Sequence, residues 1–311
     1  MSVVAARPLA VVDSAIDLIG RTPMIRLLRF APDGAEILAK CEFLNPGGSV
    51  KDRLGLGLIL DAERQGKLQP GGTIIEPTAG NTGIGLALVG TRRGYRVILC
   101  VPEKYSREKQ KAMAALGGTV VTTPTEAGMK GAIAKAFELA GEIPGAFVPQ
   151  QFANPANPRT HYESTGPEIW EQTEGRLDAI AIGGGTTGTF CGVARYLRER
   201  LPNLHCTLVE PQGSVFGGGA PGPHRMEGIG SAFWPEVMDR SLLDDVITIS
   251  DEEAFAAVKE IARTEGLLVG GSSGANATAA RRVARRLGPG KRVVTVLPDA
   301  AERYISQGIL D

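Results

Sequence analysis

Short apolar segments alternate with helical segments along most of the chain, and this alternation limits the possible folds more than any other feature. Strand-like segments occur at residues 73–75, 97–101, 119–123, 179–182, 205–209 and 292–297. Helical patterns occupy residues 84–89, 106–116, 128–140 and 251–265, with a further helix running through Arg200, and Ser106 and Ser250 are the expected N-caps. Because parallel strands need crossover connections, the alternation predicts an α/β fold with helices on both faces of a parallel sheet.

Composition narrows the function classes. The 311 residues carry 34 Lys and Arg against 34 Asp and Glu, so no basic excess is present to neutralise a nucleic acid or an anionic membrane. No apolar stretch reaches the ~20 residues of a membrane helix. The four cysteines show no paired spacing, which favours a reducing, cytoplasmic compartment and no metal site. A chain of this length predicts two domains.

The candidate functional residues lie in four glycine-rich loops, and the first loop contains a lysine. Residues 45–53 read NPGGSVKDR, and Ser49 with Asp52 resembles a capping box that starts a helix at about Val50. Lys51 then lies in the first helical turn, where the helix dipole disfavours a cation. Lys51 is therefore either a lysine that points into solvent or an amine whose charge is suppressed because it forms an imine.

The other three loops each precede a helix. Residues 76–83, EPTAGNTG, offer N–H groups and hydroxyls to a carboxylate or phosphate, although a plain strand-to-helix turn is the competing interpretation. Residues 183–189, GGGTTGT, predict a phosphate cup, because glycines let the backbone approach a ligand closely. Residues 269–275 predict a helix start with Ser272 or Ser273 as N-cap.

A phosphate site, a carboxylate site and a lysine together favour pyridoxal 5′-phosphate combined with an amino acid, because this cofactor carries both a phosphate and an aldehyde. Two other interpretations stay open on the residues alone. One is a phosphometabolite enzyme without imine chemistry, and the other is a Rossmann-like nucleotide binder.

Six segments occur in the order found in one enzyme family. Residues 45–53, 77–83, 150–158, 183–189, 227–230 and 270–274 read NPGGSVKDR, PTAGNTG, QQFANPANP, GGGTTGT, EGIG and GGSSG. Over nearly its whole length the chain therefore resembles the pyridoxal-phosphate β-family of cysteine synthases and cystathionine β-synthases, which has the tryptophan synthase β-like fold type II. The resemblance implies two three-layer α/β domains with mostly parallel sheets, and the cofactor in the cleft between them. Residues 1–45 and 150–311 would form the larger, cofactor-binding domain, and residues 46–149 a smaller mobile domain.

The resemblance also implies a role for each matching residue. Lys51 resembles the Schiff-base lysine that moves the α-proton, and Ser272 the serine that faces the pyridine nitrogen. Asn81 resembles the residue that hydrogen-bonds the ring oxygen of the cofactor. The implied phosphate cup is Gly185, Thr186, Thr187, Gly188 and Thr189, and the implied substrate-binding residues are Thr78, Ala79, Gly80, Asn81, Thr82, Gln151 and Gly228. Ala79 stands where the family usually has Ser, and Thr187 where many members have Gly.

The implied reaction is β-replacement on an activated L-serine through an aminoacrylate intermediate. O-acetyl-L-serine and sulfide would give L-cysteine and acetate, and cystathionine synthesis from serine or O-acetylserine with homocysteine is the close alternative. A serine or threonine dehydratase and a scaffold that has lost its cofactor are the remaining alternatives. Gln212 follows Glu210-Pro211 where the phosphoserine-using branch has arginine, which argues against a phosphoserine donor. The resemblance implies a homodimer.

Overall fold

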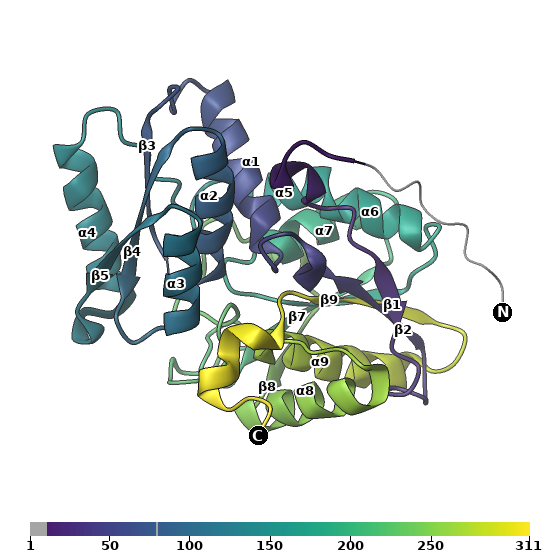
Figure 1. Ribbon diagram of the computed structural model, residues 1–311. Coiled ribbons are helices and arrows are strands. Elements are labelled where there is room, and N and C mark those ends of the chain that lie inside the picture. Colours follow the sequence, from purple (N-terminus) through teal and green to yellow (C-terminus); the bar gives the residue numbers. More distant parts are fainter. Residues whose placement is uncertain (1–10, 79) are drawn as a thin grey trace.

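Two separate sheets organise the computed structural model, which describes residues 11–78 and 80–311 (Figure 1). The six-stranded sheet has the order β1 (Met24–Arg26), β2 (Glu36–Cys41), β9 (Arg292–Leu297), β6 (Ala179–Gly183), β7 (His205–Pro211) and β8 (Asp245–Ile249). In this sheet β1 runs antiparallel to β2 and the other neighbours are parallel. The three-stranded sheet contains β3 (Thr73–Pro77), β4 (Arg96–Pro102) and β5 (Thr119–Thr123), all parallel.

Helices cover both faces of each sheet, as the alternating pattern predicts. On the six-stranded sheet, α9 (Gly271–Leu287) and α8 (Asp251–Glu265) lie on one face, and α7 (Gly188–Arg198) lies on the other with α5 (Ala156–Glu163) and α6 (Thr165–Gln172) packed against it. On the three-stranded sheet, α4 (Gly128–Glu142) faces α2 (Asn81–Arg92) and α3 (Arg107–Ala115), and α1 (Lys51–Arg64) packs on α2. Short 3₁₀ helices are η1 (Ala15–Leu18), η2 (Glu42–Leu44), η3 (Thr125–Ala127), η4 (Arg240–Leu242) and η5 (Ala301–Gln307). The α/β prediction is confirmed.

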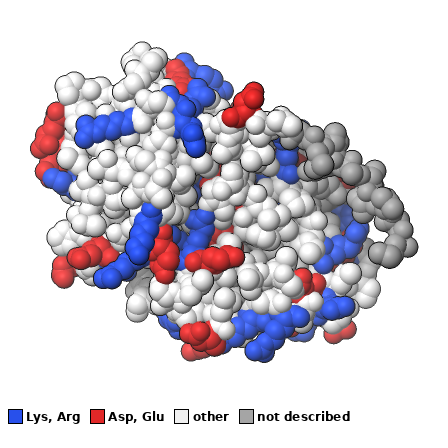
Figure 2. Space-filling model, in the orientation of Figure 1, with Lys and Arg blue, Asp and Glu red and all other residues white. Residues whose placement is uncertain are grey.

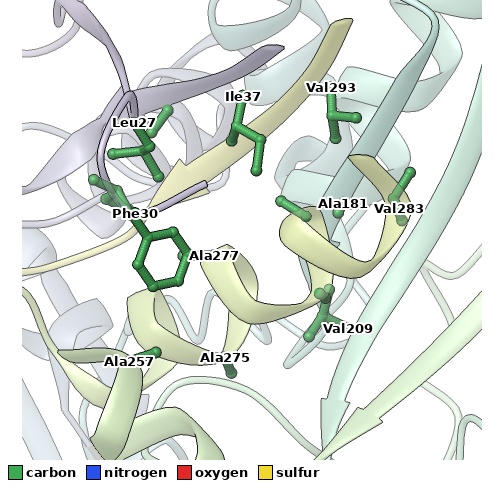
Figure 3. Close-up of a cluster of buried hydrophobic side chains, with 14 of the residues drawn as sticks. Leu27, Phe30, Ile37, Ala181, Val209, Ala257, Ala275, Ala277, Val283 and Val293 are labelled. Atoms are coloured by element: carbon green, nitrogen blue, oxygen red, sulfur yellow. The ribbon is translucent and has the colours of Figure 1, made fainter. Parts of the chain in front are cut away.

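The side chains of β6 divide between two hydrophobic cores. Ala179 and Ala181 belong to the cluster under α9, whereas Ile180 and Ile182 belong to the cluster under α7. Successive strand residues point to opposite faces, so a strand with apolar residues at every position is buried on both sides. Figure 3 shows the α9 side of this core, where small alanines let the helix lie close to the sheet.

The predicted helices and strands are present with small shifts, but two details of helix initiation were wrong. Helix α1 begins at Lys51, and the Asp52 carboxylate accepts a hydrogen bond from the Gly47 N–H at 2.6 Å, so it does not complete a capping box with Ser49. The N-cap of α9 is Gly270, which places Ser272 inside the first turn. The helix expected through Arg200 ends at Arg198.

Three properties of the structure agree with the composition of the chain. On the face drawn in Figure 2, blue and red side chains are interspersed, as expected for equal numbers of cations and anions. Within the described residues, no helix combines the length and the apolar character that a bilayer crossing requires. All four cysteines are buried and free.

Candidate active site

Lys51 lies in a small cavity at the carboxyl end of the six-stranded sheet, together with the threonine-rich loop that follows β6. The cavity is lined by Lys51, Gly185, Thr186, Thr187, Thr189 and Gly228, with Val50, Ile182, Gly183, Ile229, Asn276, Val296 and Pro298. The Val50 N–H donates to the Pro298 carbonyl at 2.9 Å, which fixes the start of α1 against the end of β9. The structure therefore contradicts the interpretation of Lys51 as a lysine that points into solvent.

The environment of Lys51 favours a neutral amine. Burial lowers the pKa of Lys51 to about 8, and the Asp299 carboxylate opposes part of this shift. With this pKa about a tenth of the amine is unprotonated at pH 7, against well under a thousandth for an ordinary lysine, and only the unprotonated form acts as a nucleophile or a general base.

The loop of residues 185–189 requires close backbone approach. A Cβ atom on Gly188 would lie 1.9 Å from Asn157 Oδ1, and a Cβ on Gly185 would lie 2.5 Å from the Gly228 carbonyl oxygen. Thr187 has a φ of +63°, which costs a β-branched residue about 1 kcal/mol, and this conformation explains why glycine suits the position. Because α7 begins at Gly188, the N-terminal turn of this helix lies beside the cavity, and unpaired N–H groups in such a turn attract anions.

Two buried side chains of α5 support this loop, and sequence reasoning did not identify them. Asn157 Nδ2 donates to Thr186 Oγ1 at 2.9 Å, and the His161 Nε2 atom lies 3.2 Å from Thr189 Oγ1. Burial, together with the charges of Lys51 and Arg53, lowers the pKa of His161 to about 3, so the ring is neutral. The spacing of Asn157 and His161, four residues apart on one helical face, was the available signal.

The predicted carboxylate loop lies at the start of α2. Thr82 Oγ1 donates to Gln151 Oε1 at 2.8 Å, which brings these two predicted residues together. Thr78 Oγ1 accepts from the Gly80 N–H at 3.2 Å. These four residues are not among those that line the Lys51 cavity, and Ala79 lies outside the described residues.

Asn81 and Ser272 also lie outside the cavity lining, each in the first turn of a helix. Asn81 Nδ2 donates to Asp299 Oδ2 at 2.6 Å, and Asn81 Oδ1 accepts from the Arg303 guanidinium at 2.8 Å. Ser272 is 2% exposed. Asn276, one turn after Ser272, does line the cavity, and its buried Oδ1 atom has no hydrogen-bond partner within the described residues.

A buried charge cluster anchors the helix that carries Lys51. The Arg53 guanidinium pairs with Glu42 at 2.7 Å and with Glu168 at 2.7 Å, and Lys40 pairs with Glu168 at 2.6 Å. Burial raises the pKa of Glu42, but the Arg53 charge and hydrogen bonds outweigh burial and hold this pKa at about 2. The cluster ties α1 to β2 and α6, so it fixes the start of α1 relative to the six-stranded sheet.

Known proteins match this chain over nearly its whole length. The chain matches the pyridoxal-phosphate dependent enzyme family over residues 15–299. It is 49% identical over 304 residues to the O-acetylserine dependent cystathionine beta-synthase of Bacillus subtilis (strain 168), a match that covers 97% of this chain and 99% of that protein. It is 49% identical over 296 residues to the cysteine synthase of Helicobacter pylori (strain ATCC 700392 / 26695), covering 94% and 97%.

A solved structure agrees with these matches. The crystal structure of O-acetylserine dependent cystathionine beta-synthase from Helicobacter pylori superposes with a TM-score of 0.92 at 48% identity, covering 97% of this chain and 99% of that chain. The expected fold type II and the expected family are both confirmed. With Lys51 and a threonine-rich anion loop in one cavity, this chain belongs to the pyridoxal-phosphate dependent enzymes.

Proposed function

We propose that this protein catalyses β-replacement on O-acetyl-L-serine, with sulfide as the acceptor and L-cysteine and acetate as the products. The observation that carries the proposal is the shared cavity of Lys51 and the 185–189 loop. The relative named O-acetylserine dependent cystathionine beta-synthase supports this donor, and the relative named cysteine synthase supports this product. Cystathionine synthesis from homocysteine is the second candidate, and the similarity to the Bacillus subtilis protein favours it.

The residues at the site fit pyridoxal phosphate. Close contacts leave no room for a side chain at Gly185 or Gly188, as expected where a phosphate meets the backbone, and Asn276 presents an unpartnered buried oxygen to the same cavity. Gly185, Thr186, Thr187, Gly188 and Thr189 would hold the phosphate, Lys51 would hold the aldehyde carbon, and Asn81 and Ser272 would contact the ring. When bound, this cofactor supplies an electron sink that makes the α-proton of an amino acid acidic.

The residues of the chain then supply binding and proton transfer. Lys51 takes the α-proton, because its pKa of about 8 makes the neutral amine far more abundant at working pH than in an ordinary lysine. N–H groups and hydroxyls at residues 78–82, together with Gln151, bind the substrate carboxylate. Ser272 contributes a hydroxyl that does not titrate at working pH. The buried setting keeps competing water away from the reacting atoms.

We also propose the division into a larger domain, residues 1–45 and 150–311, and a smaller closing domain, residues 46–149. The three-stranded sheet and its helices α1 to α4 fall within residues 46–149, which supports these boundaries. The proposed assembly is a homodimer in the cytoplasm. The family resemblance supports the dimer, and four free cysteines support a reducing compartment.

A matrix of donors and acceptors tests the proposal. Holoprotein is incubated with O-acetylserine or serine, each with sulfide, homocysteine or no acceptor, and the products are identified by mass spectrometry. We expect cysteine and acetate from O-acetylserine with sulfide. Cystathionine as the main product would favour the second candidate, and pyruvate alone would identify a dehydratase. No turnover of any combination would contradict the proposal.

A further inference from the structure

One buried carboxyl group beside the site has no part in the function proposed above. Glu76 lies on β3 and is 1% exposed. Its Oε2 atom accepts a hydrogen bond from the Gln150 N–H at 3.1 Å, and its Oε1 atom accepts from the Gln151 N–H at 3.4 Å. Within the described residues Glu76 forms no ion pair. The carboxyl group therefore serves two backbone N–H groups of one turn.

That turn contains a backbone conformation that needs support. Gln150 has a φ of +54°, in the left-handed region that non-glycine residues rarely adopt. Its carbonyl oxygen accepts from the N–H groups of Ala153 and Asn154, both at 2.9 Å, so the conformation reverses the chain just before α5. Conformations of this kind persist only where the surroundings hold them. Glu76 supplies such a restraint from the smaller sheet.

The peptide of Gln151 is held from the other side as well. Asn157 Nδ2 donates to the Gln151 carbonyl at 2.8 Å and also to Thr186 Oγ1 in the phosphate loop. With its N–H on Glu76 and its carbonyl on Asn157, Gln151 has a fixed backbone, and its side chain reaches Thr82. The turn therefore connects the carboxylate loop of α2 to the phosphate loop of α7.

We propose that Glu76 is a positioning residue for the substrate carboxylate: it holds the strained Gln150–Gln151 turn and so aims the Gln151 side chain. This inference rests on the proposed function, since it assumes that Gln151 contacts the carboxylate. It gives Glu76 no contact with the cofactor or with the reacting atoms. Losing Glu76 should therefore weaken substrate binding while the chemical step and cofactor binding change little.

The test measures the affinity of the holoprotein for L-serine by calorimetry in the E76Q variant. A glutamine amide turns an NH₂ group toward one of the two N–H donors, so the turn shifts. Burial raises the pKa of Glu76 to about 8, so the affinities are compared at about pH 9, where most of the carboxyl is ionised and both of its oxygens accept. At this pH we expect the dissociation constant for L-serine to rise about tenfold, the cost of one hydrogen bond to a charged group. Turnover at saturating O-acetylserine and the dissociation constant for pyridoxal phosphate should stay within about twofold of the wild type.

A second substitution distinguishes a shift of the Gln150–Gln151 turn from a loss of overall stability in E76Q. Gln150→Gly removes the φ penalty, so the double variant E76Q/Q150G should regain most of the serine affinity, while Q150G alone should match the wild type. E76D, which keeps a shorter carboxylate, should give an intermediate affinity and is measured in the same way if E76Q does not fold.

Three results would overturn the inference. The first is an E76Q protein with unchanged serine affinity. The second is a parallel loss of serine affinity, cofactor affinity and thermal stability that Q150G does not repair. The third is a wild-type holoprotein that does not bind serine. If the wild type binds serine but releases no cysteine or cystathionine, the proposed function fails, while the comparison of affinities still decides the role of Glu76.

Discussion

At the residue scale, burial determines the reactivity of Lys51. The sequence motif around Lys51 predicted an amine in the first turn of a helix, and the position is confirmed. The pKa could not be predicted from the sequence, because it depends on β9 and on Asp299, which is 248 positions away in the chain. The contacts that Asn157, His161 and Asn276 make at the site also depend on tertiary structure, because they require α5 and α9 to pack as they do.

The lowered pKa of Lys51 predicts the pH dependence of cofactor uptake. Only the unprotonated amine attacks the aldehyde, so its share grows as pH rises through the pKa. The rate constant for binding of pyridoxal phosphate to the apoprotein should rise through about pH 8 and then level off, whereas an ordinary lysine would have its midpoint near 10.5. Stopped-flow absorbance measures this rate, and hexylamine under the same conditions corrects for the ionisations of the cofactor. A midpoint above pH 10 would contradict the buried amine.

At the element scale, strands, helices and the N-caps Ser106 and Ser250 followed from local pattern, whereas the starts of α1 and α9 did not. Buried strands such as β6 are apolar at every position, and α8 carries the full capping box of Ser250 and Glu253, so both were predictable. The starts of α1 and α9 depend on tertiary contacts, because the N-cap Val50 donates its N–H to the Pro298 carbonyl and the N-cap Gly270 donates its N–H to the Asp299 carbonyl.

The close packing at the start of α7 predicts what a larger residue at position 188 would do to cofactor binding. Gly188→Ala places a methyl group on Asn157 Oδ1, so the loop must shift, and we expect affinity for pyridoxal phosphate to fall at least tenfold. Gly141→Ala in α4 is the matched control, since nothing lies within 4 Å of its Cβ position, and it should raise stability by about 0.5–1 kcal/mol. Fluorescence titration and urea unfolding measure the two effects. Unchanged cofactor affinity in G188A would show that the loop does not carry the phosphate.

The anchor of α1 gives a prediction about stability. Arg53→Met leaves the buried Glu42 carboxylate without its main charge partner and should destabilise the protein by about 3–5 kcal/mol in urea unfolding. The exposed Arg93–Glu63 pair is the control, and R93M should cost less than about 1 kcal/mol. E42Q/R53M should recover part of the loss, because no buried charge is left unpaired. Equal losses in R53M and R93M would contradict the anchoring role.

The stabilising effect of the same charge cluster should be lost at low pH. Because the pKa of Glu42 falls from an ordinary 4.5 to about 2 on folding, its contribution is present above pH 4.5 and is lost as pH falls toward 2. Wild-type unfolding free energy should therefore drop across this window more steeply than that of R53M, in which Glu42 titrates closer to its ordinary value. Equal slopes for the two proteins would remove Arg53 as the cause.

At the scale of the whole molecule, the C-terminal η5 segment connects distant parts of the chain. Lys109 of α3 bonds Glu227 at 2.5 Å and the Tyr304 hydroxyl at 3.0 Å, and Tyr304 in turn bonds Asp299. In Figure 1 this segment, drawn in yellow, lies beneath α3. The resemblance predicted two α/β units and the loops of the site, but this polar network could not be read from the sequence, because its members are spread over 195 positions, from Lys109 to Tyr304.

This hydrogen-bond network predicts which segments open more often when Lys109 is replaced. In K109M we expect faster amide hydrogen exchange in residues 225–230 and 301–307, because a buried ammonium that joins these segments is lost. Lys111→Met on the exposed side of α3 is the control and should leave exchange unchanged. Exchange that rises evenly along the chain would indicate general destabilisation instead of a local connection.

The proposed function requires the Lys51 amine to hold the aldehyde of pyridoxal phosphate while the 185–189 loop holds its phosphate. Borohydride reduction of the holoprotein, followed by proteolysis and mass spectrometry, tests it most directly because reduction fixes the covalent link. We expect one phosphopyridoxyl group, on the peptide that contains Lys51, and none at that position in K51A. Modification of a different lysine, or no modified peptide from cofactor-loaded protein, would contradict it.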